Sequence, residues 1–167
     1  IRIAITDYEC LKTIRKFVKE GIFSNNPLVA DIQFDHGLAV ESLEAGADCV
    51  RINPGNIGGI EKTKTVMAKA IEKKACIRIG VNSGSVEKKF LKKNQNNVTN
   101  AIVESTLEYV RLFENSGFYN FKVSAKASSV TDTIDIYKKL SEKIRYPLHL
   151  GITEAGSDFV GSIKSAI

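Results

Sequence analysis

The chain has 167 residues, 43% of them hydrophobic and 26% charged, and carries a formal net charge of +5. This composition is typical of a globular protein with its own core, and no apolar run approaches the roughly 18 residues of a membrane span. The lysines lie mainly in helix-like stretches. We therefore attribute the positive charge to solvated helix faces and expect neither nucleic acid nor membrane as a partner.

Short β-branched runs alternate with longer amphipathic runs along the chain. Strands are expected at residues 1–6, 28–34, 49–52, 76–81, 121–125 and 148–152. Helices are expected between them at residues 9–20, 38–45, 62–74, 98–115 and 132–143, and a last helix begins near Asp158. Strand and helix units that repeat without hairpin turns predict a parallel sheet. No composition break divides residues 1–167, which we expect to form a single domain.

The residues between these runs have the character of helix ends. Residues 6–9 (Thr-Asp-Tyr-Glu) have the spacing of a capping box, which predicts that the first helix is capped by Thr6. Gly21, Gly46 and Gly117 each follow a helical run, where a left-handed residue commonly ends a helix. The Lys- and Asn-rich tract at residues 88–97 is expected to be a loop.

The cysteines Cys10, Cys49 and Cys76 are odd in number and far apart. Their spacing argues against disulfides and against a metal site within this chain, and it favours a reducing, intracellular setting. We expect the cytoplasm of a bacterium, with a plastid-type organelle as the alternative. Because the chain starts with Ile1 inside a strand-like run, we also expect it to be part of a longer protein.

Each predicted strand has one apolar face and one polar face. Since side chains alternate along a strand, Arg2, Asp31, Arg51, Arg78 and Lys126 all fall on polar faces. A doubly wound sheet is covered by helices on both faces and should be apolar on both, whereas a barrel can enclose a polar face. The sequence therefore predicts a fragment of a (β/α)8 TIM-type barrel with about six parallel strands visible. About two strands are missing, at least one of them beyond the last residue.

In such a barrel the three arginines and Lys126 would converge from four strands. Asp31 and Glu154 supply at most two compensating negative charges, so the cations would repel each other unless an anion binds. A diphosphate fits this requirement, because a planar guanidinium can meet phosphate oxygens in a bidentate manner. The turns at residues 53–56 and 82–85 can add backbone N–H groups.

Other interpretations of the same residues remain open. The arginines can instead form a structural network of salt bridges with Asp31, Asp48 and Glu154. Lys126 can act as the Schiff-base lysine of an aldolase-like barrel. His149, near a strand end, can be an acid/base group or a hydrogen-bonded interior residue. Cys49 and Cys76 are expected to be small core residues.

Several stretches resemble, in order, the barrel of the hydroxymethylbutenyl diphosphate synthase family. They are PLVADIQFDH (27–36), RINPGNIGG (51–59), RIGVNSGS (78–85), SAKASSV (124–130), PLHLGITEAG (147–156) and IKSAI (163–167). The resemblance implies reductive opening of methylerythritol cyclodiphosphate in the non-mevalonate isoprenoid pathway. It also implies a [4Fe-4S] cluster fed by flavodoxin or ferredoxin, and a homodimer of full-length chains.

The resemblance assigns roles to particular residues. The substrate contacts it implies are Arg2, Arg51, Asn53, Arg78, Asn82 and Lys126. Asp31 and Glu154 match the family's carboxylates near the reacting end, and we expect them to be catalytic. The cluster belongs to a C-terminal domain that this chain does not contain, so we expect no cofactor within residues 1–167 and no activity from this segment alone.

The chain departs from the family at Gln33, which stands where a histidine is usual and receives no role. His36, beside Asp35, is expected to be a loop or capping residue. The alternative functions are another phosphate-binding barrel, either a Schiff-base aldolase or a pterin-dependent synthase, and a non-catalytic anion-binding barrel.

Overall fold

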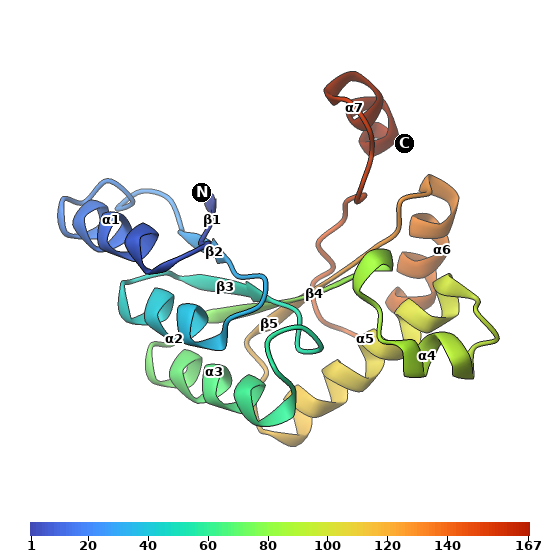
Figure 1. The fold of residues 1–167 in the computed structure, drawn as a ribbon, viewed down its shortest axis with the longest axis horizontal. Coiled ribbons are helices and arrows are strands. Elements are labelled where there is room, and N and C mark those ends of the chain that lie inside the picture. The colour runs from blue at the N-terminus through green and yellow to red at the C-terminus, as the bar shows by residue number, and fades with distance from the viewer. The chain divides into compact units, whose positions relative to one another are not determined.

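The computed structural model describes residues 1–167 and shows an α/β fold with five strands (Figure 1). The strands are β1 (Arg2–Ala4), β2 (Val29–Asp31), β3 (Cys49–Ile52), β4 (Cys76–Asn82) and β5 (Phe121–Lys126). They follow one another in the sheet in chain order, and the pairs β1–β2, β2–β3 and β3–β4 are parallel. Sequential parallel strands joined through helices confirm the predicted fold class.

The helices lie close to the predicted positions. They are α1 (Tyr8–Lys19), α2 (His36–Glu44), α3 (Ile60–Glu72), α4 (Lys88–Lys93), α5 (Val98–Asn115), α6 (Val130–Ser141) and α7 (Asp158–Ala166), with a short 3-10 helix η1 (Ser83–Ser85). None of them combines the length and the apolar character that spanning a membrane would require.

The chain divides into two compact units. The first comprises residues 1–79 and 116–121, and the second comprises residues 80–115 and 122–167. In the first unit, α2 and α3 lie side by side along the sheet (Figure 1). The apolar residues of β3 and β4, such as Val50 and Ile77, are fully buried, as are Val66 and Ala70 of α3. Burial of this apolar face leaves the opposite side of each strand for polar groups.

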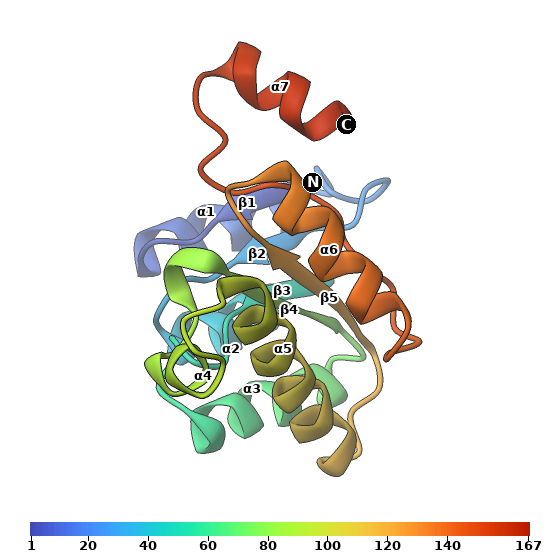
Figure 2. The same ribbon diagram turned by 90° about the vertical axis from the view of Figure 1, so that its right-hand side faces the viewer.

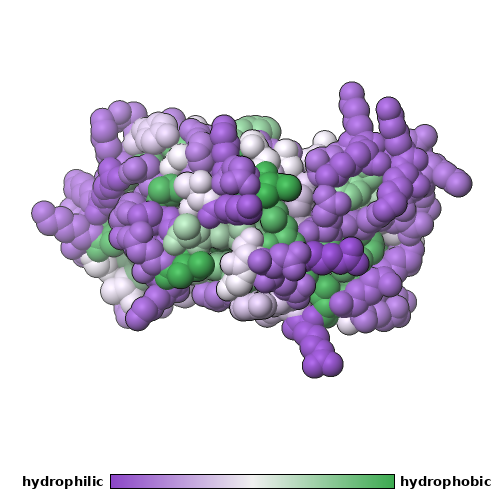
Figure 3. Space-filling model, turned by 90° about the horizontal axis from the view of Figure 1, so that it is seen from below, coloured by the Kyte–Doolittle hydropathy of each residue, from purple (hydrophilic) through white to green (hydrophobic).

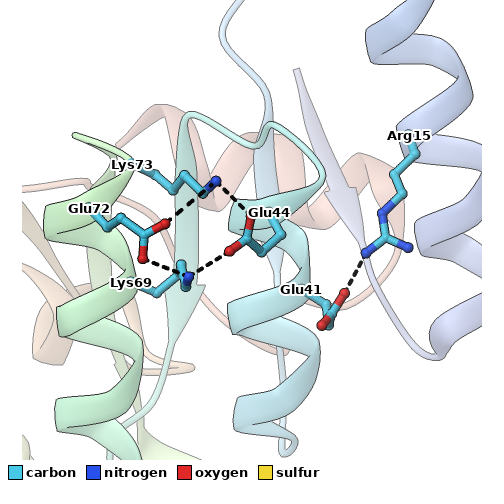
Figure 4. Close-up of polar contacts among 6 residues, drawn as sticks. All are labelled: Arg15, Glu41, Glu44, Lys69, Glu72 and Lys73. Atoms are coloured by element: carbon cyan, nitrogen blue, oxygen red, sulfur yellow. Dashed lines mark hydrogen bonds and ion pairs between the residues drawn. The ribbon is translucent and has the colours of Figure 1, made fainter.

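Ion pairs join the outer surfaces of α1, α2 and α3 (Figure 4). Lys69 of α3 binds Glu44 of α2 at 2.5 Å and Glu72 at 2.7 Å, and Lys73 binds Glu44 at 2.6 Å. Hydrogen bonds from the two lysines lower the pKa of Glu44 to about 2. Arg15 of α1 pairs with Glu41 of α2 in the same layer.

In the second unit, α5 packs beside α6, and α4 lies against α5 (Figure 2). The apolar stripe of α5 is buried, with Ile102 and Phe113 fully covered, and α6 contributes Ile136 and Leu140. The face of the molecule in Figure 3 is mainly hydrophilic, and its hydrophobic residues form small separate patches. Such scattered exposure is ordinary for a protein surface.

The sixth predicted strand, at residues 148–152, is reduced to one parallel bridge between Val123 and Leu148. The first hydrogen bonds are those of a parallel strand pair. Val123 N–H donates to Pro147 C=O at 2.9 Å, and His149 N–H donates to Val123 C=O at 2.7 Å. The next rung is occupied by a side chain. The Tyr137 hydroxyl donates to His149 C=O at 2.7 Å and accepts from Ala125 N–H at 3.2 Å. This hydroxyl separates the two backbones where a strand would continue.

Two local predictions were wrong. The first helix is capped by Asp7, not Thr6, because the Asp7 carboxylate reaches the Cys10 N–H at 2.9 Å. Within the tract predicted as a loop, α4 forms because Phe90 is buried and the side chains of α4 find carboxylates on α5.

Candidate functional site

Three guanidinium groups in the first unit surround one carboxylate, that of Asp31 at the end of β2. Arg51 Nη1 lies 3.3 Å from Asp31 Oδ1, Arg2 Nε lies 3.6 Å from Oδ2, and Arg78 Nη2 lies 4.0 Å from Oδ2. The strand register explains this convergence, since Asp31 is level with Arg51 and Arg51 is level with Arg78. Residues at one level of neighbouring strands share a face of the sheet.

The charges of this arginine cluster do not balance, because three positive charges meet one negative charge. The Arg78 side chain is only 4% exposed and Asp31 is 20% exposed, whereas Arg2 is 52% exposed. Burial lowers the pKa of Arg78, the positive charge of Arg2 and Arg51 adds to this, and Asp31 opposes it. A partly buried excess of cations is stabilised by an additional anion, and guanidinium groups favour phosphate.

The structure also bears on the alternative of a purely structural salt-bridge network. Asp31 does bind all three arginines, as that alternative requires. Asp48 does not take part in the ion pairs of the cluster, and its carboxylate instead accepts the Leu28 N–H at 2.7 Å. Glu154 belongs to the other unit. Of the three carboxylates in this alternative, Asp31 is therefore the one that compensates the positive charge of the arginines within the first unit.

Asn53 follows β3 and is 2% exposed. Its side-chain oxygen accepts the Gly55 N–H at 3.1 Å, and its backbone C=O accepts the N–H groups of Asn56 and Ile57. These bonds form a tight turn at residues 53–57 directly after the strand that carries Arg51. Asn53 therefore shapes the glycine-containing turn that the sequence suggested as a phosphate contact.

The second unit holds the other predicted site residues at strand ends. Asn82 ends β4, and its N–H donates to Ser85 Oγ at 3.3 Å, while this hydroxyl donates to Asn82 C=O at 3.2 Å. These bonds close the turn that contains η1. Lys126 ends β5, and its Nζ lies 3.0 Å from the place that a Cβ at Gly151 would occupy. The glycine therefore provides the space in which the lysine side chain lies.

Glu154 has a left-handed backbone with φ of +52°, which is uncommon for a residue other than glycine. Its Oε1 lies 3.3 Å from the place of a Cβ at Gly84, so the carboxylate rests on the turn after β4. Backbone strain of this kind is concentrated at functional sites. The structure thus brings together Glu154 and the turn at residues 82–85, two features that the sequence placed about 70 positions apart.

Gly151 and Tyr137 were not identified by sequence reasoning, and Gly84 was identified only as part of the turn at residues 82–85. Gly84 and Gly151 lie inside the stretches NSGS and HLGIT. A glycine beside polar residues could have indicated that another group approaches the backbone closely there. No local signal marked Tyr137. His149 takes part through its backbone, and His36 is the first residue of α2, next to the capping residue Asp35.

The cysteines do not form a metal site. Cys10 lies in the first turn of α1, whereas Cys49 and Cys76 lie at one level of β3 and β4. No group of three or more His, Cys, Asp or Glu side chains is arranged to hold a metal ion. The residues present therefore do not fit an iron–sulfur cluster.

A cavity of about 420 Å³ in the second unit is a poor candidate for an anion site. It lies along α6 and α7, and its lining includes Ile134, Leu148, Ile152 and Ile167. Lys138 and Lys164 also line it, but the lining is mostly apolar and has no arginine cluster like the one at Asp31.

Comparison with known proteins gives one consistent result. Residues 1–167 match the family model described as the GcpE TIM-barrel domain. The chain is 52% identical to a protein of Caldanaerobacter subterraneus subsp. tengcongensis and 49% identical to one of Maridesulfovibrio salexigens. A protein of Ruminiclostridium cellulolyticum is 48% identical.

All three relatives are named 4-hydroxy-3-methylbut-2-en-1-yl diphosphate synthase (flavodoxin). Each match covers 100% of this chain and 46% of the relative, so the chain spans about half the length of the curated relatives it matches. The expectation of a TIM-barrel fragment is confirmed by the family match over every residue. The chain belongs to the GcpE TIM-barrel domain family.

Proposed function

We propose that this domain binds the diphosphate group of methylerythritol cyclodiphosphate in a 4-hydroxy-3-methylbut-2-enyl diphosphate synthase of the non-mevalonate isoprenoid pathway. The observation that carries the proposal is the arginine cluster, in which three guanidinium groups share a single carboxylate. The names of relatives about half identical to this chain point to the same reaction.

In this proposal, Arg2, Arg51 and Arg78 bind phosphate oxygens, and the turn shaped by Asn53 presents its N–H groups to them. Asn82 and Lys126 are the remaining proposed substrate contacts. The full-length protein has one substrate-binding domain, formed by residues 1–167, and a separate cluster domain.

Asp31 and Glu154 serve as carboxylates near the reacting end of the substrate. Asp31 has a second role on this chain, because it holds the three guanidinium groups in position before substrate arrives. Glu154 is held over the turn after β4 by its left-handed backbone.

The reaction requires reduction, and a [4Fe-4S] cluster would supply the electrons. Because the cysteines of this chain do not form a metal site, we assign that cluster to the separate domain. We further propose that flavodoxin or ferredoxin is the electron donor, that the full-length enzyme is a homodimer, and that it works in the bacterial cytoplasm.

The test uses the full-length gene product, purified without oxygen and supplied with methylerythritol cyclodiphosphate and reduced flavodoxin or dithionite. We expect formation of hydroxymethylbutenyl diphosphate, and a loss of about a thousandfold in kcat/KM for Arg51→Ala and Arg78→Ala. Residues 1–167 alone should show neither turnover nor the brown colour of a cluster. Absence of product from the full-length protein would overturn the proposal.

The aldolase alternative is tested separately. If Lys126 forms a Schiff base, borohydride should trap a carbonyl substrate on it irreversibly. We expect no trapping, because the proposed role of Lys126 is electrostatic. A non-catalytic barrel would bind pyrophosphate but would form no product.

A further inference from the structure

We propose that Tyr109 and Glu87 form a clamp that positions the turn after β4 for the diphosphate. Tyr109 is therefore a positioning residue for the reaction proposed above. The inference rests on the proposed function in one respect, namely that the ligand of the turn is a diphosphate. The clamp lies wholly within the second unit and uses none of the predicted site residues.

The clamp consists of one buried tyrosine and one carboxylate that binds it from another helix terminus. Tyr109, on α5, is 6% exposed, and its hydroxyl donates to Glu87 Oε2 at 2.5 Å. Glu87 is the N-cap residue of α4, yet its side chain makes no capping hydrogen bond to that helix. Glutamate is not among the residues that usually cap a helix with their side chains, so this carboxylate is available to another element. Here the carboxylate binds a different helix.

The surroundings of the clamp keep the Tyr109 hydroxyl protonated. Lys89 Nζ lies 3.7 Å from Glu87 Oε1 and 2.8 Å from Glu108 Oε1. Burial, followed by the Glu87 carboxylate, raises the pKa of Tyr109 far above its usual value, although Ser105 has a small opposite effect. The Tyr109 hydroxyl therefore remains a donor throughout the physiological range.

The clamp is next to the turn in sequence and in space. Glu87 is two residues after η1, and η1 contacts α5. The turn itself is closed by the bonds between Asn82 and Ser85, and it carries the Glu154 carboxylate over Gly84. Fixing Glu87 to α5 therefore fixes the chain that leaves this turn. A turn ordered before the ligand binds loses less conformational freedom on binding.

Other contacts also attach α4 to α5, but they do not replace the clamp. Asn94 donates to Glu104 Oε2 at 2.6 Å, and Lys93 pairs with the same carboxylate. These contacts lie at the far end of α4 from the turn. At the end of α4 that joins η1, the pair of Tyr109 with Glu87 is accompanied by the ion pair of Lys89 with Glu108, which lies on the exposed surface.

The chain offers a matched control. Tyr146 donates to Glu114 Oε1 at 3.0 Å, so it makes the same kind of bond near the C-terminal end of α5. In the full-length gene product, Tyr109→Phe and Tyr146→Phe each remove one hydroxyl and leave the ring. Glu87→Gln keeps an acceptor for Tyr109 and should show a weaker form of the Tyr109→Phe effect.

The first readout is amide hydrogen exchange at residues 83–87. Tyr109→Phe should accelerate it roughly tenfold or more, as expected for loss of a hydrogen bond to a charged group, whereas Tyr146→Phe should not. The second readout is binding of inorganic pyrophosphate and turnover of methylerythritol cyclodiphosphate. Tyr109→Phe should raise the pyrophosphate Kd and the substrate KM by roughly tenfold, with kcat changed less than about twofold.

The outcomes separate the clamp from the proposed function. Unchanged exchange at residues 83–87 in Tyr109→Phe, or equal acceleration in both tyrosine variants, would overturn the clamp. Accelerated exchange with an unchanged pyrophosphate Kd would overturn its role in ligand binding. A wild-type protein that forms no product would overturn the proposed function, while hydrogen exchange and pyrophosphate binding would still decide on the clamp.

Discussion

Substitution of Asp31 by asparagine tests the electrostatics of the arginine cluster directly. The change keeps the size of the side chain but removes the one negative charge that faces Arg2, Arg51 and Arg78. Unit charges about 4 Å apart interact by about 4 kcal/mol at an effective dielectric constant near 20. The variant loses these attractions and keeps the repulsions among the guanidinium groups.

Breaking a buried ion pair by removing one partner costs about 3–5 kcal/mol. The Asp31 side chain is 20% exposed and Arg2 is 52% exposed, so solvent screens part of the interaction. We therefore expect the free energy of unfolding to fall by about 3 kcal/mol, the lower end of that range. Urea denaturation of the full-length gene product, followed by circular dichroism, measures it.

Inorganic pyrophosphate should restore most of this loss, because the added anion takes the place of the missing charge. At a hundred times its Kd, a ligand specific for the folded state stabilises it by about 2.7 kcal/mol. Asp48→Asn is the matched control, since the Asp48 carboxylate accepts a backbone N–H and is not an ion-pair partner of the cluster. An Asp31→Asn variant within about 1 kcal/mol of wild type, or one that pyrophosphate does not stabilise, would refute the reasoning.

Three further changes probe the scaffold. Gly46→Ala should destabilise by about 1–3 kcal/mol more than Gly21→Ala. Both positions have positive φ, but a Cβ at Gly46 would lie 2.9 Å from Val18 Cγ1, whereas Gly21 faces open space. Tyr137→Phe should cost about 1–3 kcal/mol, because the buried Ala125 N–H loses its hydroxyl partner. Glu44→Gln should flatten the acid side of the stability profile, because the carboxylate's pKa is lowered from 4.5 to about 2. Its stabilisation is complete above pH 4.5 and is lost as the pH falls towards 2.

Urea denaturation measures the first two changes, and denaturation at a series of pH values measures the third. Equal losses for the two glycine variants would show that the contact with Val18 does not matter. Tyr146→Phe is the control for Tyr137→Phe, because its hydroxyl bonds a carboxylate instead of two backbone groups. An unchanged slope below pH 4.5 in Glu44→Gln would contradict the role of the lysines.

The sequence by itself determined the order of the elements and the faces of the strands. Helix α5 and strand β3 have the predicted bounds, and Gly21, Gly46 and Gly117 all have positive φ at helix ends. These features depend on periodicity and backbone preference, which neighbouring residues specify. The same two-residue period placed Arg51 and Arg78 on one face of the sheet before any contact was known.

Only the tertiary structure decided which groups meet. The shared position of three guanidinium groups at Asp31 depends on the register between strands. The sixth strand is interrupted where a tyrosine from α6 occupies one rung, and α4 forms because α5 supplies its partners. Such outcomes depend on residues that are distant in the chain, so no local pattern could specify them. Periodicity fixes the direction in which a side chain points, but packing determines what it meets there.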